Sequence, residues 1–361
     1  MKKLSIVLGL VLWSLFAAVA LPLQPPLLGT PTLTVPAKDH PLTHFPTSWV
    51  TWNLQWFPGQ TPRAKEPARE KHEKAVQETL QNINPQVAIL EEVMDEGALG
   101  RVISDHPWRA VSNFQRAKDE DEKLPPQNVA IASQIPWREV WEVDFHALPL
   151  TPDRPVRGFL GAEFSDRGGR SLTVYAVHLK SNRGGREASG ERRERAVDYL
   201  RWDWHRRGLD PHQDAILVAG DFNCSLRNPE FAEEQTIRRL LKEGWISAAE
   251  EIPWPEAATV KADPFRKYPP ADFDHILLSP GWIKMFGDQQ REVRVVRKGD
   301  VPSDHFPVEL KYFPPKVAPE STRPQQRFSA KPRYCLATAH TTYDQMQNVS
   351  MLNFSGGRVW R

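Results

Sequence analysis

Short runs of apolar residues alternate with longer amphipathic stretches through most of this 361-residue chain, from about Trp49 to Tyr312. Runs such as 87–90 and 215–219 have the length and composition of buried β-strands. Residues 66–83 and 187–206 are long enough for helices, and the first places most of its apolar residues on one helical face. This alternation predicts an α/β domain in which helices cover sheets. Because strand-like runs outnumber helical ones, we expect a mixed sheet or two sheets rather than one parallel sheet.

Further apolar runs predict the remaining strands, at 49–52, 129–131, 157–164, 172–179, 276–278, 293–296 and 308–310. A third helix is predicted between 228 and 244. Asn228 is a favourable N-cap, Pro229 suits the first helical position, and Gly244 lies just beyond the expected end.

Residues 1–20 have the pattern of a signal peptide. Lys2 and Lys3 precede an apolar run that ends near Phe16, and Ala18-Val19-Ala20 is a small-x-small cleavage pattern. We therefore expect cleavage near Ala20 and export to the periplasm or the exterior. The alternative is an uncleaved anchor, but the run is shorter than the roughly 20 residues of a membrane span. No later segment is apolar enough to span a membrane, and we expect a monomer.

The rest of the chain divides into three parts. Residues 21–47 are rich in proline and are predicted to form an extended leader. Residues 48–313 form the predicted catalytic domain. Residues 314–361 are basic and polar, which predicts a poorly ordered tail. The charges of the tail and the signal peptide hide an acidic body: the whole chain has a formal charge of +2, yet residues 21–313 carry −5. Bulk charge thus gives no support for general nucleic-acid binding.

Polar side chains stand at six ends of the apolar runs. They are Asn53, Glu91 with Glu92, His178, Asp221 with Asn223, Asp274 with His275, and Asp304 with His305. Ligands bind beyond strand ends in α/β folds. Carboxylate and amide oxygens suit Mg²⁺ or Mn²⁺, whereas two cysteines are too few for a cysteine-based zinc site. Histidines beside carboxylates suit acid–base chemistry. The pattern predicts metal-assisted hydrolysis.

Each of these groups also has an ordinary structural explanation. Gly220-Asp221-Phe222-Asn223 has the composition of a polar turn, a single histidine is often structural, and Glu91 is an alternative to Glu92 as the functional carboxylate. Other hydrolytic signatures are missing from the sequence, because it contains neither Gly-x-Ser-x-Gly nor a Walker-type phosphate loop.

Taken in order, six segments resemble the endonuclease/exonuclease/phosphatase superfamily. The segments are Thr51-Trp52-Asn53-Leu54, Ala88-Ile89-Leu90-Glu91-Glu92-Val93, Val177-His178-Leu179-Lys180-Ser181, Gly220-Asp221-Phe222-Asn223, Asp274-His275-Ile276 and Ser303-Asp304-His305-Phe306-Pro307. The resemblance implies a four-layer sandwich of two packed mixed β-sheets flanked by helices. It also implies Mg²⁺- or Mn²⁺-dependent hydrolysis of a phosphoester.

The resemblance further implies roles for individual residues. Glu92 would bind the metal with help from Asn53 and Asp304. Asp221 would orient or deprotonate the attacking water, and Asn223 would hold the phosphate. His305, paired with Asp274, would contact the scissile phosphate, His178 would be the second histidine of the family, and Arg157 would contact phosphate. The chain departs from the family in having Glu91 where glutamine is usual. The partner expected for His178 is replaced by Gln127-Asn128. A disulfide between Cys224 and Cys335 is possible if the tail folds back.

The substrate is predicted from local charge. Residues 180–207 carry a net charge of +4, and their first part should lie on the catalytic rim because it follows His178. We expect Arg183 and Arg186 to contact the backbone of a nucleic acid, which would make the protein an exported nuclease. The simpler alternative for the helical part is an ordinary charged surface. Phospholipids, inositol phosphates and a non-catalytic binding module are the other functions considered.

Overall fold

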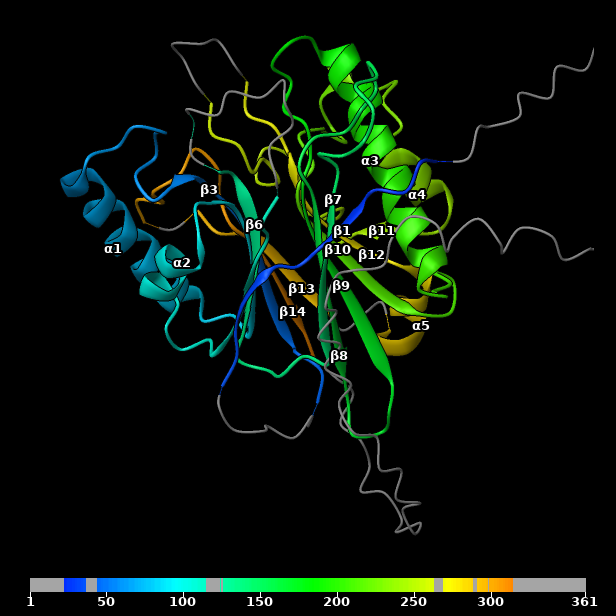
Figure 1. Cartoon of the computed structure of the whole chain (residues 1–361), viewed down its shortest axis with the longest axis horizontal. Helices are drawn as coiled ribbons and strands as arrows, with labels where there is room; N and C mark the ends of the chain where they lie inside the picture. Colours follow the sequence, from blue (N-terminus) through cyan, green and yellow to red (C-terminus); the bar gives the residue numbers. More distant parts are fainter. Residues whose placement is uncertain are drawn as a thin grey trace, which may run out of the picture. The chain divides into compact units, whose positions relative to one another are not determined.

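Two seven-stranded mixed sheets pack face to face in the computed structural model (Figure 1). The structure describes residues 23–36, 44–114, 124, 126–262, 269–287, 291–297 and 299–313. The predicted signal peptide, the predicted tail and Cys335 lie outside the described residues, and so does the suggested disulfide. Cys224 is buried and forms no disulfide within the described part of the chain.

Each sheet combines parallel and antiparallel neighbours. Sheet A has the strand order β1 (Leu27–Gly29), β7 (Glu139–Asp144), β8 (Gly158–Ser165), β9 (Ser171–His178), β10 (Ala215–Asp221), β12 (Asp274–Leu278) and β11 (Ile246–Ser247). Sheet B has the order β13 (Arg291–Val295), β14 (Val308–Tyr312), β3 (Ser48–Phe57), β4 (Val87–Val93), β6 (Asn128–Ser133), β5 (Trp108–Val111) and β2 (Thr32–Thr34). Among the strands that the structure describes, β9–β10 and β3–β4 pair in parallel and the other pairs are antiparallel.

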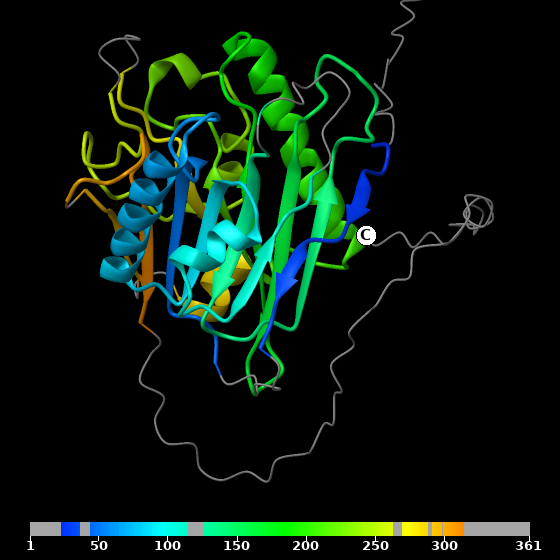
Figure 2. The ribbon, with the colours of Figure 1, turned by 60° about the vertical axis from the view of Figure 1, so that its left-hand side comes forward.

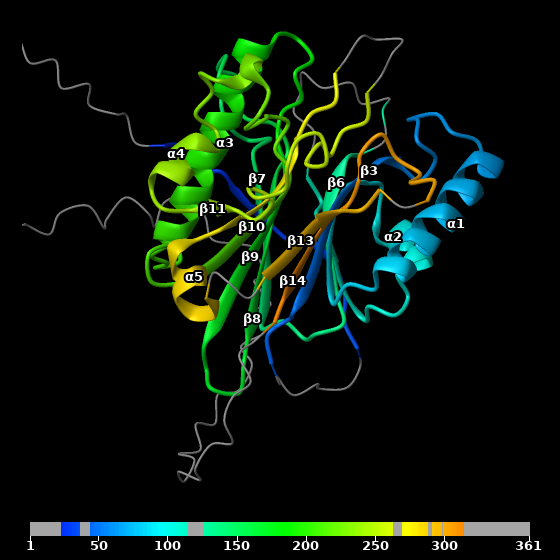
Figure 3. The same ribbon diagram turned by 180° about the vertical axis from the view of Figure 1, so that it is seen from behind.

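Helices cover the outer faces of both sheets, which makes four layers (Figure 3). The helix α1 (Glu66–Ile83) packs on sheet B beside α2 (Glu96–Val102), while α3 (Arg186–Arg206) and α4 (Arg238–Lys242) pack on sheet A. Between the sheets, Trp49 of β3 meets the Phe164 ring of β8 edge-on, and α5 (Pro280–Phe286) adds Trp282 to the same core. Burying each large apolar side chain stabilises the fold by about 1.5–3 kcal/mol. The predicted fold class is confirmed.

The described part of the proline-rich segment belongs to the domain, which amends the prediction of a separate leader. Its backbone is extended, as the prolines require, but β1 pairs with β7 and β2 pairs with β5. The segment therefore adds an edge strand to each sheet (Figure 2). Short edge strands such as these protect the longer strands that they cover from pairing with other chains.

The helix predicted between 228 and 244 is broken in two. Asn228 caps a single 3₁₀ turn at Pro229–Phe231, and α4 begins only at Arg238. Between them, Glu234 turns inward and forms two hydrogen bonds with the buried guanidinium of Arg193 on α3. A buried charged group needs its partner, and this tertiary contact overrides the local helical signals. None of the described helices combines the length and hydropathy that a membrane crossing requires.

Candidate active site

Three polar side chains stand in one row across neighbouring strands of sheet A. At the end of β10, Asp221 pairs in register with His178 of β9 on one side and with Asp274 of β12 on the other. Residues in register point to the same face of a sheet. Gly220 makes this close approach possible: its φ is +144°, and a β-carbon there would lie 1.8 Å from the Val177 carbonyl oxygen.

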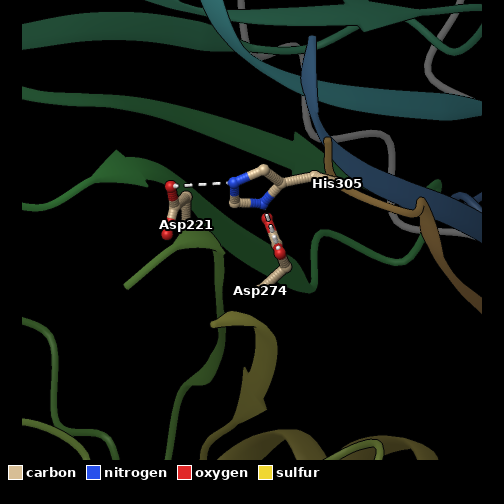
Figure 4. Close-up of side chains that lie close together, drawn as sticks. All are labelled: Asp221, Asp274 and His305. Atoms are coloured by element: carbon tan, nitrogen blue, oxygen red, sulfur yellow. Dashed lines mark hydrogen bonds and ion pairs between the residues drawn. The ribbon is translucent and has the colours of Figure 1, made fainter. Parts of the chain in front are cut away.

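His305 joins this row from the loop before β14 (Val308–Tyr312) (Figure 4). Its Nδ1 hydrogen-bonds to Asp274 Oδ2 at 2.7 Å, and its Nε2 lies 4.0 Å from Asp221 Oδ2. All three side chains are buried. A carboxylate on one ring nitrogen fixes the tautomer and leaves the other nitrogen for a substrate. The predicted pairing of His305 with Asp274 is present.

Sheet B supplies a second group of polar side chains through two irregular strands. The register of β3 shifts after Asn53, and the register of β4 shifts between Glu91 and Val93. Bulges of this kind re-aim side chains next to functional sites. They turn Glu92 outward, where its carboxylate accepts hydrogen bonds from the Trp56 backbone N–H at 2.7 Å and from Asn53 Nδ2 at 3.3 Å.

One amide joins the two sheets at the site. Asn53 Nδ2 also donates to Asp221 Oδ2 at 3.0 Å, while Asn53 Oδ1 accepts the Gln55 backbone N–H. His178 Nε2 faces the same place, 3.6 Å from Asp221 Oδ2 and 3.9 Å from Glu92 Oε1. The polar ends of both sheets therefore form one site.

Backbone conformation marks the same region. Seven non-glycine residues among those described have positive φ, and five of them surround this site: Gln55, Trp56, Glu92, Arg157 and Asn223. Left-handed backbone costs about 1 kcal/mol or more per residue and concentrates at functional sites. Asn223 is held in this conformation by its N–H, which donates to Asp221 Oδ1, and by its amide, which donates to the Leu179 carbonyl.

The two histidines are set in opposite charge states. Burial opposes an imidazolium at His305, but Asp274 and Asp221 outweigh it and hold the pKa of His305 well above its ordinary value. Burial, the Arg157 charge and the His305 charge hold the pKa of His178 well below its ordinary value. Groups whose pKa values are pushed apart are typical of acid–base sites.

The carboxyl groups are also perturbed. Burial, only partly offset by the His305 charge, raises the pKa of Asp221 to about 7. Burial and the charges of Asp274 and Asp221 raise the pKa of Glu91 well above its usual range. One carboxyl oxygen of Glu91 accepts a hydrogen bond from the Thr51 hydroxyl, and the other has no hydrogen-bond partner among the described residues. Glutamine, which is usual at this position in the family that the sequence resembles, has the shape of Glu91 and could accept the same hydrogen bond from Thr51.

The site fits a divalent cation. Three buried carboxyl groups face a single imidazolium, and Asp274 Oδ1 and Glu91 Oε2 are buried without a hydrogen-bond partner in the described part of the chain. Asp221, Asp274 and His305 place ligand atoms within 4.8 Å of one another. However, His305 Nδ1 and Asp274 Oδ2 are hydrogen-bonded to each other at 2.7 Å, an arrangement that suits an acid–base pair. Glu92, half-buried beside Asn53, remains the carboxylate that would hold the cation.

The predicted metal ligand Asp304 makes no side-chain contact with the other two predicted ligands, Glu92 and Asn53, among the described residues. Its side chain is exposed, and no hydrogen bond or ion pair within the described ranges connects it to Glu92 or Asn53. Its backbone N–H donates to Gln55 Oε1 at 3.1 Å, so the main chain of Asp304 is tied to strand β3 two residues after Asn53. The predicted partner region of His178 is engaged elsewhere, because Gln127 accepts from Arg157 and Asn128 donates to Met94.

The cationic rim lies on the His178 side of the site. Arg157 donates to the carbonyl oxygens of His178 and Leu179. Arg183 is exposed, whereas Arg186 forms an exposed ion pair with Glu230 at 2.7 Å. Farther along α3 (Arg186–Arg206), arginines pair with acids such as Asp153 and Glu243. These ion pairs favour the simpler alternative for the helical part, an ordinary charged surface.

Lys180 begins the rim loop predicted from the sequence, although no role of its own was predicted for it. Its ammonium donates to the carbonyl oxygens of Ser181 and Arg183, and no carboxylate pairs with it among the described residues. Burial, followed by the charges of Arg157 and three other arginines, lowers the pKa of Lys180 to about 8. Its place in the segment Val177-His178-Leu179-Lys180-Ser181, two residues after His178, is the sequence feature that points to a position beside the site.

Comparisons with known proteins identify the family of the chain and agree with its fold. The sequence profile of the endonuclease/exonuclease/phosphatase family matches residues 50–305. The chain belongs to this family, whose members are phosphoester hydrolases. A search of curated protein sequences finds no match.

Solved structures show the same fold at low sequence identity. The catalytic domain of human Nocturnin with bound sulfate is 16% identical, with a TM-score of 0.52 over 74% of this chain and 94% of that one. Sphingomyelinase C from Streptomyces griseocarneus is 16% identical, with a TM-score of 0.53 over 75% and 100%. The beta toxin of Staphylococcus aureus is 16% identical, with a TM-score of 0.52 over 74% and 100%.

Proposed function

We propose that this protein is an exported, divalent-metal-dependent phosphodiesterase that cleaves nucleic acid. The observation that carries the proposal is the buried Asp274–His305–Asp221 arrangement, which is joined to Glu92 through Asn53. A phosphodiester is anionic and repels a nucleophile. Its hydrolysis requires charge neutralisation, an oriented water and a proton donor. When bound, Mg²⁺ or Mn²⁺ supplies charge neutralisation and can activate water.

The chain's own residues supply the proton transfers. Asp221, with a pKa of about 7, accepts a proton from the attacking water near neutral pH. The His305 imidazolium, held by Asp274, presents its Nε2 N–H to the scissile phosphate and gives its proton to the leaving oxygen as the P–O bond breaks. His178 is neutral and donates a hydrogen bond to the same phosphate or water, and Asn223 contacts the phosphate beside it.

The rim supports a substrate that carries more than one phosphate. Lys180 and Arg183 add positive charge beside Arg157, and the adjacent Gly184-Gly185 leaves the loop open to a neighbouring backbone. Repeated phosphates are the feature of nucleic acids that such cations bind without sequence preference. Export rests on the pattern of residues 1–20.

A substrate panel tests this function. The mature protein, with Mg²⁺ or Mn²⁺, is assayed against plasmid, single-stranded DNA, RNA, sphingomyelin and inositol phosphates, with Glu92→Gln as the matched inactive control. We expect cleavage of a nucleic acid, its loss on chelation, and its recovery on adding metal. Cleavage of sphingomyelin or an inositol phosphate alone would move the protein to a phospholipid or small-molecule phosphoesterase. Full activity in excess chelator would contradict the proposed metal dependence.

The N-terminus of the exported protein tests localisation separately. We expect it to begin at about Leu21. Soluble exported protein that retains Lys2 would contradict cleavage.

A further inference from the structure

We propose that His72 is a positioning residue for the catalytic centre, because it ties the loop that precedes His305 to the loop that follows β3 (Ser48–Phe57), the strand that carries Asn53. The inference rests on the proposed function, since it concerns how the same site is held together. His72 lies on α1 (Glu66–Ile83), outside the set of residues that the catalytic chemistry uses.

His72 uses both ring nitrogens on backbone groups of two different loops. Its side chain is 3% exposed. Nδ1 accepts the Gly59 backbone N–H at 2.7 Å, and Nε2 lies 2.7 Å from the Pro302 carbonyl oxygen. The Phe57 ring meets the imidazole edge-on at 5.5 Å. One rigid ring thus bridges the loop after β3 (Ser48–Phe57) and the loop before β14 (Val308–Tyr312).

The two contacts fix the protonation state of the ring. A backbone N–H can only donate and a carbonyl oxygen can only accept. The imidazole must therefore be neutral, with its hydrogen on Nε2. Burial, stronger here than the Pro302 contact and the Glu73 charge, lowers the pKa of His72 to about 4, which agrees with a neutral ring.

The loop before His305 also contacts strand β3 itself at the catalytic site. Asp304 N–H donates to Gln55 Oε1 at 3.1 Å, and Ser303 Oγ donates to the Asn53 carbonyl at 2.7 Å. On the following residue, the His305 carbonyl accepts the indole N–H of Trp52 at 3.1 Å. These contacts secure the site end of the loops, and His72 secures the end nearer α1. Displacing the Pro302 end would move His305 relative to Asp274.

A second buried histidine gives a matched control. His106 is 1% exposed, its Nε2 contacts the Pro85 carbonyl at 2.8 Å, and its Nδ1 contacts Asp105 at 2.9 Å. It resembles His72 in burial and in its proline carbonyl partner. None of its hydrogen bonds among the described residues reaches the Asn53 or His305 loops.

The experiment compares His72→Phe and His72→Gln with His106→Phe and His106→Gln. The first readout is the NMR signal of the Trp52 indole N–H, with its hydrogen-exchange rate, because this group reports directly on the His305 loop. The second is the division of any activity loss between kcat and KM. Phenylalanine keeps the ring packing and removes both hydrogen bonds, whereas glutamine retains a donor near Pro302.

We expect His72→Phe to shift the Trp52 indole signal, speed its exchange and lower kcat by up to about 10²-fold, since misplacement of about 1 Å costs that much. His72→Gln should recover part of each effect, and both His106 variants should leave the indole signal unchanged. Should His72→Phe not fold, His72→Gln against His106→Gln carries the comparison. Equal effects of the paired variants on the indole signal would overturn the proposal. The indole signal can be measured even if the protein cleaves no phosphodiester. A failure of the proposed function can therefore be distinguished from a failure of the role proposed for His72.

Discussion

The catalytic centre and the cationic rim lie side by side but are built differently. In the centre, Asp221, Asp274 and His305 are buried, and each is fixed by strand register or by a short hydrogen bond. On the rim, Arg183 is exposed, and Arg186 pairs with an exposed glutamate. Asp221 and Asp274 come from the ends of sheet strands, whereas Lys180, Arg183 and Arg186 of the rim come from the loop after β9 (Ser171–His178) and the start of α3 (Arg186–Arg206).

The difference has an electrostatic consequence. Desolvation shifts the pKa values of the central groups and sets His305 and His178 in opposite charge states. Exposed arginines keep their charge and are screened by salt. The centre should therefore control turnover, and the rim should control affinity and its salt dependence. Predictions for Asp221 and His305, for the two glutamates and for the rim arginines test this division, and a prediction for His72 tests how the centre is held together.

The largest expected effect is at the centre. Asp221→Ala and His305→Ala should each lower kcat by about 10²–10⁴-fold, the usual range for one positioned proton-transfer group. The fold should survive, because both residues stand at the edge of the core. Steady-state kinetics with circular dichroism checks both points. Wild-type turnover in either variant would show that this residue does not take part in proton transfer, and would contradict the proposal that the centre controls turnover.

Neighbouring glutamates sharpen the comparison within the centre. Glu92→Gln should lower activity by about 10²-fold or more, because a metal ion supplies several kcal/mol of charge stabilisation. Glu91→Gln should change kcat by less than about threefold, roughly 0.7 kcal/mol, since glutamine keeps the volume and the acceptor for Thr51. Kinetics with a metal titration measures both. The reverse ranking would identify Glu91 as the metal carboxylate.

Stability should depend on pH through His72. Its folded-state pKa of about 4 lies below the ordinary 6.5, so the unfolded chain binds the proton more tightly. The stabilisation is full above pH 6.5 and is lost as the pH falls toward 4, by up to about 3 kcal/mol at 1.36 kcal/mol per pKa unit. Urea unfolding of wild type and His72→Phe at several pH values measures this. Parallel pH profiles for the two proteins would show that His72 titrates normally.

The smallest effect is expected on the rim. Arg183→Ala with Arg186→Ala should flatten the slope of log affinity against log salt by about one to two units on duplex DNA, at about 0.9 per phosphate contact. Arg183 should contribute more than Arg186, because Glu230 already neutralises the latter. Binding of the catalytically inactive forms at several salt concentrations checks this. An unchanged slope would remove the loop from recognition.

Much of the fold and the site could be predicted from local patterns. The helix over residues 66–83 and the buried strands at 87–90 and 215–219 follow from hydrophobic periodicity alone, and they appear at those positions. The polar residues at their ends were found for the same reason. Glu234 shows where this reasoning fails, since its attraction to the buried Arg193 breaks a helix that every local signal favours.

By itself the sequence determined which residues end each strand, because apolar runs and the polar groups that terminate them are properties of neighbours along the chain. Only the tertiary structure decided how those ends meet. It placed His178, Asp221 and Asp274 in one register, separated the outward Glu92 from the buried Glu91, and connected two distant loops through His72. These arrangements depend on desolvation and on contacts between residues far apart in sequence, and no local pattern encodes either.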